Sequence, residues 1–181
     1  MWGKTGIRNV SRPAAVAAAL CSALFGATLA LPIAPAASAA TTYWSFDNAK
    51  RGCLESTASG TVFEGACDSG NVQQDWYWTG SMNSQGRRML ASRVSGRCLA
   101  TDIKSGLNQA NAVWTSFTCD ADARGQRWRF DYNGIDTYGQ FDSGYGTALR
   151  TSPGLPESVY SDEFTTTVAL DYYYWSTSLS G

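Results

Sequence analysis

Four of the five cysteines of this 181-residue chain, Cys53, Cys67, Cys98 and Cys119, follow the first forty residues, and their type and spacing point most directly to chemistry. Such cysteines bind a metal ion or form disulfides, and zinc sites use closely spaced pairs such as Cys-x-x-Cys, commonly with His. The spacings here are far wider, and the chain contains no His. We therefore predict two disulfides, no metal site and no cofactor, although the count alone leaves three pairings open.

Catalytic chemistry has little support in the sequence. Without His, neither a Ser-His-Asp nor a Cys-His arrangement can form. Two carboxylates that face each other across a cleft can hydrolyse glycosides, but among fifteen acidic residues some pair is inevitable and none is singled out. The glycines from Gly139 to Gly146 indicate a turn-rich connection rather than a phosphate-binding loop. We therefore expect no enzymatic activity.

The first forty residues (1–40) have the organisation of a secretory signal peptide. Three basic residues precede a weakly apolar run from Pro13 to Leu31, and the small-residue motif Ala37-Ser38-Ala39 follows as a cleavage signature. A single membrane anchor is the alternative reading of the run. The run is rich in Ala and is followed by prolines without a polar stop pattern, which favours the signal peptide.

The remainder, residues 41–181, has the length of one domain with one core. Three of the fourteen basic residues and none of the fifteen acidic residues lie before residue 41, so this part carries eleven basic and fifteen acidic residues, a formal net charge of −4. A mildly acidic surface argues against binding to nucleic acid or to an anionic membrane. We expect a secreted, extracellular domain, of which the sequence leaves the oligomeric state open.

Two short motifs, Gln74-Asp75-Trp76 and Gln126-Arg127-Trp128, mark an internal repeat. Each Trp stands nine residues after a cysteine, and a Cys-Leu pair lies upstream of each motif (53–54 and 98–99). In a strand, residues two apart share a face, so the Gln and the Trp point to the same side. The Trp offers apolar area for a core, whereas a buried Gln amide must find hydrogen-bond partners.

A third, decayed copy follows. Gly146-Thr147-Ala148-Leu149 stands where the Cys-Leu pairs stood, Leu170-Asp171 echoes the second cysteine with its Asp, and Tyr173-Tyr174-Trp175 replaces Gln-x-Trp. Both lost cysteines become apolar residues, Ala148 and Leu170. This indicates that the buried positions are kept while the bridge is lost.

The repeat organises the predicted architecture. It favours the local disulfides Cys53–Cys67 and Cys98–Cys119, one in each of the first two copies, each worth roughly 3 kcal/mol by loop closure. One copy cannot bury its own apolar face, whereas three can share a core. We expect Trp76, Trp128 and Trp175 to meet near a pseudo-threefold axis as structural core.

Short apolar or aromatic runs separated by turn residues predict an all-β domain. Turn signals are clearest at 69–71, 83–86, 133–134 and 152–154. We predict strands at 43–46, 53–56, 61–66, 74–78, 88–93, 97–101, 112–118, 126–131, 137–141, 147–151, 166–170 and 172–176.

The series Gly-x-Cys-Leu, Cys-Asp and Gln-x-Trp resembles the ricin B-type lectins, a β-trefoil family, over residues 41–181. Two copies match strongly, and the third, from Gly146, is weak. The resemblance implies a β-trefoil of three four-stranded repeats with pseudo-threefold symmetry. It also implies a non-catalytic module that binds sugars in shallow pockets, each with a carboxylate shortly after Cys-Leu, an aromatic ring two residues before the second cysteine, and an amide at or beside the Gln.

Transferred to the first repeat, the resemblance places Glu55 at the carboxylate position, with amides from Gln73 and Gln74. The stacking position is Gly65, which carries no ring, although Phe63 lies on the same strand face. Glu55 and Gln73 are therefore the carbohydrate-binding residues implied for this repeat, and Gln74 is interpreted as scaffold.

In the second repeat, Phe117 fills the stacking position and Gln126 supplies the amide. Ala100 stands at the carboxylate position, with Asp102 two residues later. We expect Asp102, Phe117 and Gln126 to converge on one sugar, with a scaffold role as the alternative for Gln126. In the third repeat, Arg150 stands where the acid belongs, and the aromatic run at 172–175 is interpreted as core with a stacking surface as the alternative.

The first function hypothesis is a secreted carbohydrate-binding module whose partner is a carbohydrate or glycoconjugate. The alternative is a β-trefoil protein-interaction module, such as a secreted protease inhibitor or toxin-associated subunit, whose partner is another secreted protein. The incomplete pockets and a long acidic loop from Pro153 to Glu163 motivate this alternative. A structural protein without a small ligand is the third possibility.

Overall fold

The computed structural model describes residues 39–103, 110–132, 138–165 and 167–180. Apart from its last two residues, the expected signal peptide lies outside these ranges. Within them, no helix has the length and apolar character that a membrane crossing requires.

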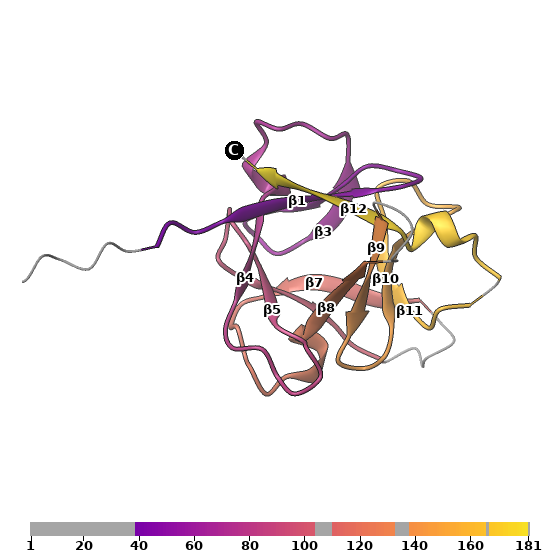
Figure 1. Ribbon diagram of the computed structural model, residues 1–181. Helices are drawn as coiled ribbons and strands as arrows, with labels where there is room; N and C mark the ends of the chain where they lie inside the picture. The colour runs from indigo at the N-terminus through magenta and orange to yellow at the C-terminus, as the bar shows by residue number, and fades with distance from the viewer. Residues whose placement is uncertain (1–38, 104–109, 133–137, 166, 181) are drawn as a thin grey trace, which may run out of the picture. The chain divides into compact units, whose positions relative to one another are not determined.

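The described chain is all-β, with twelve strands in one curled antiparallel sheet and three 3-10 turns (Figure 1). The strands are β1 Tyr43–Asn48, β2 Cys53–Ser56, β3 Val62–Gly65, β4 Trp76–Thr79, β5 Met89–Ser92, β6 Cys98–Thr101, β7 Asn111–Ser116, β8 Trp128–Tyr132, β9 Tyr138–Ser143, β10 Ala148–Thr151, β11 Val159–Asp162 and β12 Trp175–Ser180. The 3-10 turns are η1 Val72–Gln74, η2 Arg124–Gln126 and η3 Leu170–Tyr172, and each lies shortly before a strand that starts with Trp.

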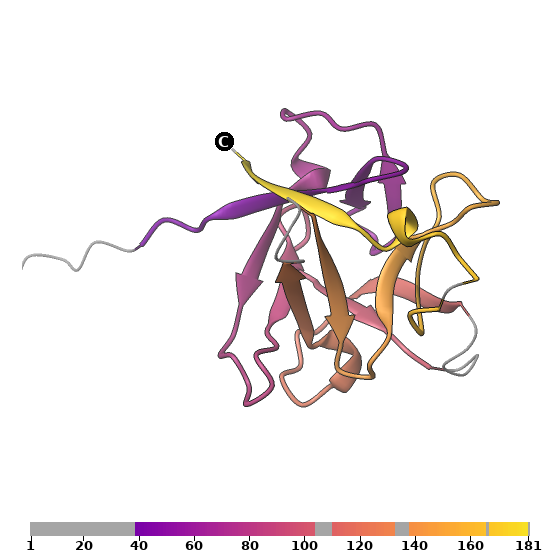
Figure 2. The ribbon, with the colours of Figure 1, turned by 45° about the vertical axis from the view of Figure 1, so that its right-hand side comes forward.

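Six strands form a closed ring. β1 pairs with β4, β4 with β5, β8 with β9, β9 with β12, and β12 returns to β1, while a bridge between Arg88 and Trp128 joins β5 to β8. Figures 1 and 2 show the first and last strands, indigo and yellow, running side by side. The ring reduces the strand edge that is open to pairing with other chains, although β8 meets the β5 side only at the single bridge between Arg88, just before β5, and Trp128.

Three hairpins, β2–β3, β6–β7 and β10–β11, lie outside the ring and pair with one another. β7 pairs with β11, and single bridges connect Thr61 to Trp114 and Phe63 to Ser158. Each hairpin starts after a ring strand and returns to a ring strand that begins with Trp. The three Trp side chains therefore enter the core at the end of the ring that faces the hairpins.

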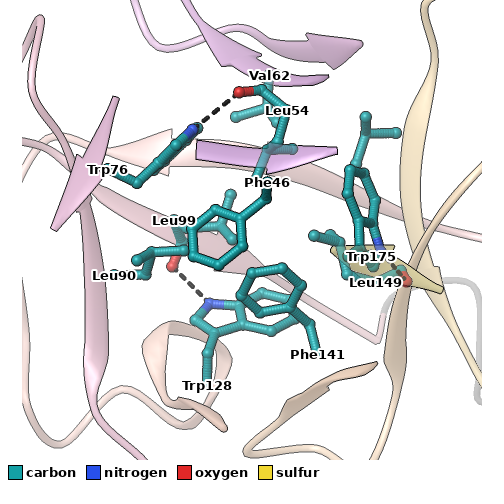
Figure 3. Close-up of a cluster of buried hydrophobic side chains, with 11 residues drawn as sticks. Phe46, Leu54, Val62, Trp76, Leu90, Leu99, Trp128, Phe141, Leu149 and Trp175 are labelled. Carbon is teal, nitrogen blue, oxygen red and sulfur yellow. Dashed lines mark hydrogen bonds between the residues drawn. The ribbon is translucent and has the colours of Figure 1, made fainter. Parts of the chain in front are cut away.

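The three Trp side chains make the same contact in all three copies. Each is fully buried, and each indole N–H donates to the carbonyl oxygen of a Leu in the hairpin of its own copy (Figure 3). The pairs are Trp76 with Leu54 at 2.9 Å, Trp128 with Leu99 at 2.9 Å and Trp175 with Leu149 at 3.1 Å. Burial of one such side chain stabilises the fold by a few kcal/mol.

Phe46 and Phe141 lie among the three indoles (Figure 3). Their ring centroids are 4.7 Å apart, and the Phe141 ring stands edge-on to both Trp128 and Trp175, at 6.3 and 6.1 Å. All of these rings belong to one hydrophobic core. The expectation of a shared Trp core therefore agrees with the structure, with two Phe rings filling the space between the indoles.

Buried hydroxyl groups connect one copy to the next beside this core. Ser56 at the end of β2 donates to Ser92 at 2.6 Å, and Thr151 at the end of β10 donates to the Asn48 amide oxygen at 3.0 Å. Thr101 at the end of β6 is bonded to Ser161. Because buried polar groups need partners, these bonds set the relative position of neighbouring hairpins.

Both disulfides join cysteines of the same copy, Cys53 to Cys67 and Cys98 to Cys119. This is the local pairing that the repeat favours. The third copy corrects two expectations. The predicted strand at 166–170 is absent from its described residues, because β11 lies earlier, at 159–162, inside the segment expected to be an acidic loop. Leu170 belongs to η3 and is 42% exposed. The cysteines that it was expected to match, Cys67 and Cys119, are exposed and half-buried, so this position is not a buried one in any of the three copies.

Candidate functional site

In the first repeat, Glu55 occupies the hollow that the resemblance assigns to a sugar. Glu55 is only 6% exposed, and its carboxylate accepts hydrogen bonds from the Asn71 amide at 3.1 Å and the Gln74 amide at 2.7 Å. Gly65 leaves the space for it, since a Cβ on this residue would lie 2.0 Å from Glu55 Oε1. The carboxylate is therefore held by the scaffold, while the half-buried Gln73 beside it is fixed through its N–H to the Asn71 side chain at 3.1 Å.

The structure places Asp102 and Phe117 at opposite ends of one hairpin. Strand β6 pairs Cys98 with Ser116 and Thr101 with Val113. Asp102 follows the second pair and Phe117 follows the first, so roughly 17 Å of strand separates them at about 3.3 Å per residue. The two side chains do not converge on one ligand.

Phe117 also falls one residue beyond the stacking position. Cys53 pairs with Gly65, whereas Cys98 pairs with Ser116, so Phe117 is an additional residue after the strand. Counting back from the cysteine hides this insertion. The Phe117 ring is 83% exposed, and its one recorded ring contact is the Arg97 guanidinium, 4.6 Å from the ring centroid.

Gln126 is buried at 7% exposure, and its amide is used by the scaffold. Its Nε2 donates to the Thr118 carbonyl at 3.1 Å, and its Oε1 accepts the Asp120 N–H at 2.9 Å. Gln74 makes the same pair of bonds, to the Ala66 carbonyl at 2.7 Å and from the Asp68 N–H at 2.9 Å. Both Gln side chains therefore fix the loop before their Trp, which is the scaffold alternative.

In the third repeat, Arg150 belongs to a buried polar network. Its Nε donates to Asp162 at 2.8 Å, its guanidinium lies 5.6 Å from the centroid of the Tyr160 ring, and the Tyr173 hydroxyl donates to Asp162 at 2.9 Å. Burial, followed by the hydrogen bond to Asp162, raises the pKa of Tyr173 above its ordinary value of 10.0. Arg150 is therefore held by the scaffold of the third repeat.

A polar hollow of about 640 Å³ lies elsewhere, between the β4–β5 loop, the loop before β8 and the β9–β10 turn. Its lining residues are mostly polar: Asn83, Gln85, Arg87, Ala121, Asp122, Arg124, Arg127, Gly144, Tyr145 and Gly146. The sequence did not point to this site, because its parts come from three loops that only the fold brings together. In the sequence, the features noted above that belong to this site are the Gly-rich stretch at 139–146 and the arginines that flank Gln126.

Side-chain hydrogen bonds hold all three loops of this polar hollow. Asn83 Oδ1 accepts the N–H groups of Gln85 and Arg87 at 3.0 and 2.9 Å. Asp120 Oδ1 accepts the Asp122 N–H at 2.8 Å, and Ser143 Oγ accepts the Tyr145 N–H at 3.2 Å. The hollow is therefore largely pre-formed, as binding sites usually are.

Two of the arginines bring charge that no carboxylate of the described chain neutralises. Arg124 donates from Nε and Nη2 to the Gly144 carbonyl at 3.2 and 3.1 Å, and Arg127 donates to the carbonyls of Ala121 and Ser81 at 2.6 and 2.8 Å. Each guanidinium has five N–H groups, so both retain donors for a ligand. Arg87, in contrast, is paired with Asp142 at 2.6 Å.

Tyr145 contributes the aromatic ring of the polar hollow. Its ring lies 5.2 Å from the Arg124 guanidinium, and a Cβ on Gly125 would be 3.0 Å from its Cε2. Gly125 also passes so close to the Thr101 carbonyl that a Cβ would lie 1.9 Å from it. A glycine at this position therefore lets the loop and the ring pack together.

The described residues offer one group with the spacing of metal ligands: Asp47, Cys53 and Cys67. Both sulfur atoms are bonded to each other in the disulfide, so neither can act as a thiolate ligand. Partial desolvation raises the pKa of the Asp47 carboxyl beside them. This group is not a metal site while the disulfide is intact.

No protein-family profile and no curated protein matches the chain. Solved structures do match. A designed threefold-symmetric protein, ThreeFoil, is 20% identical with a TM-score of 0.60, over 75% of this chain and 96% of its own. SeviL, solved with asialo-GM1 saccharide, is 12% identical with a TM-score of 0.54, over 77% of this chain and 98% of its own.

An exo-β-1,3-galactanase from Clostridium thermocellum, 1,3Gal43A, is 19% identical with a TM-score of 0.60. The match covers 78% of this chain but only 31% of the galactanase. At such identities the comparisons establish the fold alone: this chain has a β-trefoil-like fold of the kind found in lectins and in modules of larger enzymes.

Proposed function

We propose that this protein is a secreted carbohydrate-binding module without catalytic activity of its own, built as a β-trefoil of three four-stranded repeats, and that it binds saccharides in the polar hollow. The observation that carries the proposal is the composition of this hollow. Guanidinium donors, carboxylate and amide acceptors and a tyrosine ring surround one pre-formed space. Sugars present hydroxyl groups and a C–H face, and sites for them combine a few convergent polar groups with an aromatic ring.

The structural neighbours support the lectin-like part of the proposal. SeviL was solved with a saccharide, and the galactanase match covers a part of a chain that acts on a galactan. The three equivalent Trp–Leu hydrogen bonds and the closed strand ring support the threefold architecture. The two disulfides suit an oxidising, extracellular environment.

The polar hollow is a better candidate than the positions implied by the family resemblance. Glu55 and Arg150 are buried and bonded within the scaffold, and Asp102 lies far from Phe117 along the hairpin. Arg124 and Arg127 give the hollow a positive charge, so saccharides that carry a carboxylate or sulfate group are the preferred ligands.

A glycan array with neutral, carboxylated and sulfated saccharides tests the proposal on the purified chain. We expect binding to acidic saccharides that falls at least tenfold in Tyr145→Ala and in Arg124→Ala. Phe117→Ala is the matched control, because this exposed ring lies outside the hollow and belongs to the family-type site. Loss of binding in Phe117→Ala alone would move the site to that position, and absence of any binding would remove the lectin assignment.

A second candidate, a protease inhibitor, is favoured by the loop between β10 and β11. Leu155 at its tip is 57% exposed. The loop is held on both sides, since Arg51 donates to the carbonyls of Ser152 and Pro153 at 3.1 and 2.9 Å, and the Glu157 N–H donates to Glu64 at 3.0 Å. An exposed loop on fixed supports is the geometry with which such inhibitors enter a protease cleft.

Inhibition assays against trypsin-, chymotrypsin- and subtilisin-type proteases distinguish this candidate. The exposed Leu155 favours proteases that cleave after large apolar residues, and Leu155→Asp should abolish inhibition without unfolding the chain. Lack of inhibition of all three classes by the unmodified chain would eliminate this candidate.

A further inference from the structure

A second cavity, of about 270 Å³, lies within the strand ring, at the end away from the hairpins. Half of its lining residues are aromatic and come from β1, β4 and β8: Trp44, Phe46, Trp78, Trp128 and Phe130. The others come from the β4–β5 loop, β8 and β12: Met82, Gly86, Arg88, Arg129 and Thr177. On β1, Trp44 lies two residues before Phe46, and on β4, Trp78 lies two residues after Trp76, so both side chains point into the ring beyond the shared core. We refer to this space as the axial cavity.

Two polar atoms are trapped in the wall of the axial cavity. Arg88 Nε and Thr177 Oγ1 are buried, and neither has a hydrogen-bond partner among the described residues. Native proteins leave few buried polar groups unsatisfied, because each such group has lost its water without a replacement. Because both atoms are buried rather than exposed to the cavity, a ligand with hydrogen-bond acceptors would supply what they lack once the two side chains turn toward this space.

The charge in the axial cavity comes from Arg88. Arg129, which also lines the cavity, is paired with Asp131 at 2.6 Å and Asp142 at 3.3 Å. Arg88 has no carboxylate partner among the described residues, and its recorded side-chain bond is a long one of 3.4 Å to the Trp78 carbonyl. An uncompensated guanidinium beside aromatic walls favours an anionic group on an otherwise apolar ligand.

We propose that the axial cavity binds a small aromatic acid, with its ring between Trp44 and Trp78 and its carboxylate on Arg88 and Thr177. The volume fits this class, since a dry apolar cavity of about 150 Å³ holds one benzene ring, and about 270 Å³ therefore suits one or two fused rings. This site goes beyond the proposed saccharide binding, which uses different lining residues, although the β4–β5 loop contributes to both sites. The two activities can fail independently.

Titration calorimetry with 1-naphthoate tests the proposal on the full chain, with 1-naphthalenemethanol as the uncharged probe. The unmodified chain should bind 1-naphthoate, with quenching of Trp fluorescence. Arg88→Met keeps the alkyl stem and the backbone bridge to Trp128 but removes the charged donor. It should weaken 1-naphthoate ten- to hundredfold and change the alcohol by less than about threefold.

Lys50→Met is the matched control, because it removes an exposed charge that is paired with Asp171 and lies outside the cavity lining, and it should leave 1-naphthoate binding within about twofold. If Arg88→Met does not fold, Thr177→Leu is the second variant, since its larger side chain enters the cavity and should abolish binding of both probes. No binding of 1-naphthoate to the unmodified chain, or equal binding by a folded Arg88→Met or Thr177→Leu variant, would overturn the proposal. Undiminished saccharide binding in these variants would show that the two sites are separate.

Discussion

The first and third copies of the repeat fasten the same place in the fold by different means. Cys53 at the start of β2 pairs in register with Gly65 and is bridged to Cys67. At the start of β10, Ala148 takes the place of Cys53 and pairs with Asp162, which takes the place of Gly65. The third copy thus exchanges a covalent bridge for a carboxylate.

That carboxylate connects the hairpin to the strand that follows it. Asp162 accepts hydrogen bonds from Arg150 and from Tyr173, and Tyr173 stands two residues before its Trp, where the other copies have Gln. In the first copy, Gln74 reaches Glu55 at 2.7 Å. In both copies, side chains therefore connect the residue two before the Trp to the residue two after the start of the hairpin strand. In the first copy the connection is the Gln74 amide bonded to the Glu55 carboxylate. In the third copy the Tyr173 phenol and the Arg150 guanidinium both bond to the Asp162 carboxylate.

The difference teaches that the fold requires a connection at this place but not a particular chemistry. A disulfide acts mainly by restricting the unfolded chain. Reducing agents remove this effect because they cleave the S–S bond. A buried ionic network acts in the folded state and depends on every partner being present. The two kinds of copy should therefore respond to different perturbations.

The largest expected effect is the loss of Asp162. Asp162→Ala leaves the Arg150 guanidinium buried without its carboxylate, and removal of one partner of a buried pair typically costs about 3–5 kcal/mol. Urea unfolding followed by circular dichroism measures the free energy of unfolding. The double variant Asp162→Ala/Arg150→Met should regain much of the loss. The exposed pair Lys50–Asp171 is the control, and Asp171→Ala should cost below about 1 kcal/mol.

Removal of either disulfide should cost about 3 kcal/mol, because the bridges close segments with sequence separations of 14 and 21 residues. Paired Cys→Ala variants in urea unfolding measure each bridge separately. Dithiothreitol should destabilise the unmodified chain. It should have no effect on the stability of a variant in which all four disulfide cysteines are replaced by Ala. A dithiothreitol effect on that variant would contradict the assignment of redox sensitivity to the first two copies.

The two Gln-x-Trp amides should differ from each other. Gln74→Ala removes a donor from the buried Glu55 carboxylate, and loss of a hydrogen bond to a charged group costs about 1.5–3 kcal/mol. Gln126→Ala removes bonds to backbone groups only, with an expected cost near 1 kcal/mol. Equal losses in thermal or urea unfolding would show that Glu55 does not depend on Gln74.

The smallest effect at neutral pH is expected for Tyr173→Phe, with a loss of about 1 kcal/mol for one hydrogen bond. Its signature is the pH dependence. The raised pKa of Tyr173 means that the folded protein holds this proton more tightly than the unfolded chain does. The stabilisation is fully present below the unfolded pKa near 10.0 and is lost as the pH rises through the folded pKa.

Stability of the unmodified chain should therefore fall as the pH rises above 10, by up to about 1.4 kcal/mol per pH unit while only the unfolded state is ionised. Tyr173→Phe should show a shallower decline over the same range. Parallel curves for the two proteins in urea unfolding at pH 9 to 11 would show that this tyrosine titrates alike in both states.

Much of the fold was accessible from the sequence because two copies of the motif are intact. The repeat identified Trp76 and Trp128 as core residues and favoured the observed bridges. The expectation that each Gln shares a strand with its Trp was wrong, because Gln74 and Gln126 lie in the 3-10 turns before β4 and β8. The third copy was predicted correctly at its start, Ala148 and Leu149, and at its Trp175, but not in the segment between them. In that segment the chemistry changed: Asp162, opposite Ala148, makes the connection, and Leu170 does not take over the role of the second cysteine.

The candidate site was much less accessible. An inserted residue before Thr118 shifts Phe117 out of register, and no count from a cysteine can reveal it. The polar hollow and the axial cavity are lined by loops and strands that are distant in sequence. Tyr145 and Arg88 can therefore be identified as site residues only when the fold is known. Local spacing predicts strands and cores well, whereas a site assembled from three loops leaves little pattern in any one of them.

The pairing of β1 with β12 runs from Tyr43 opposite Ser180 to Asn48 opposite Trp175. Residues directly opposite in an antiparallel pair have Cα atoms about 4.5–5.5 Å apart. A linker of a few residues could therefore join position 180 to position 43, and new ends could be opened in the loop between β10 and β11. Such a circular permutant would keep every strand neighbour while changing only the order in which the chain visits them.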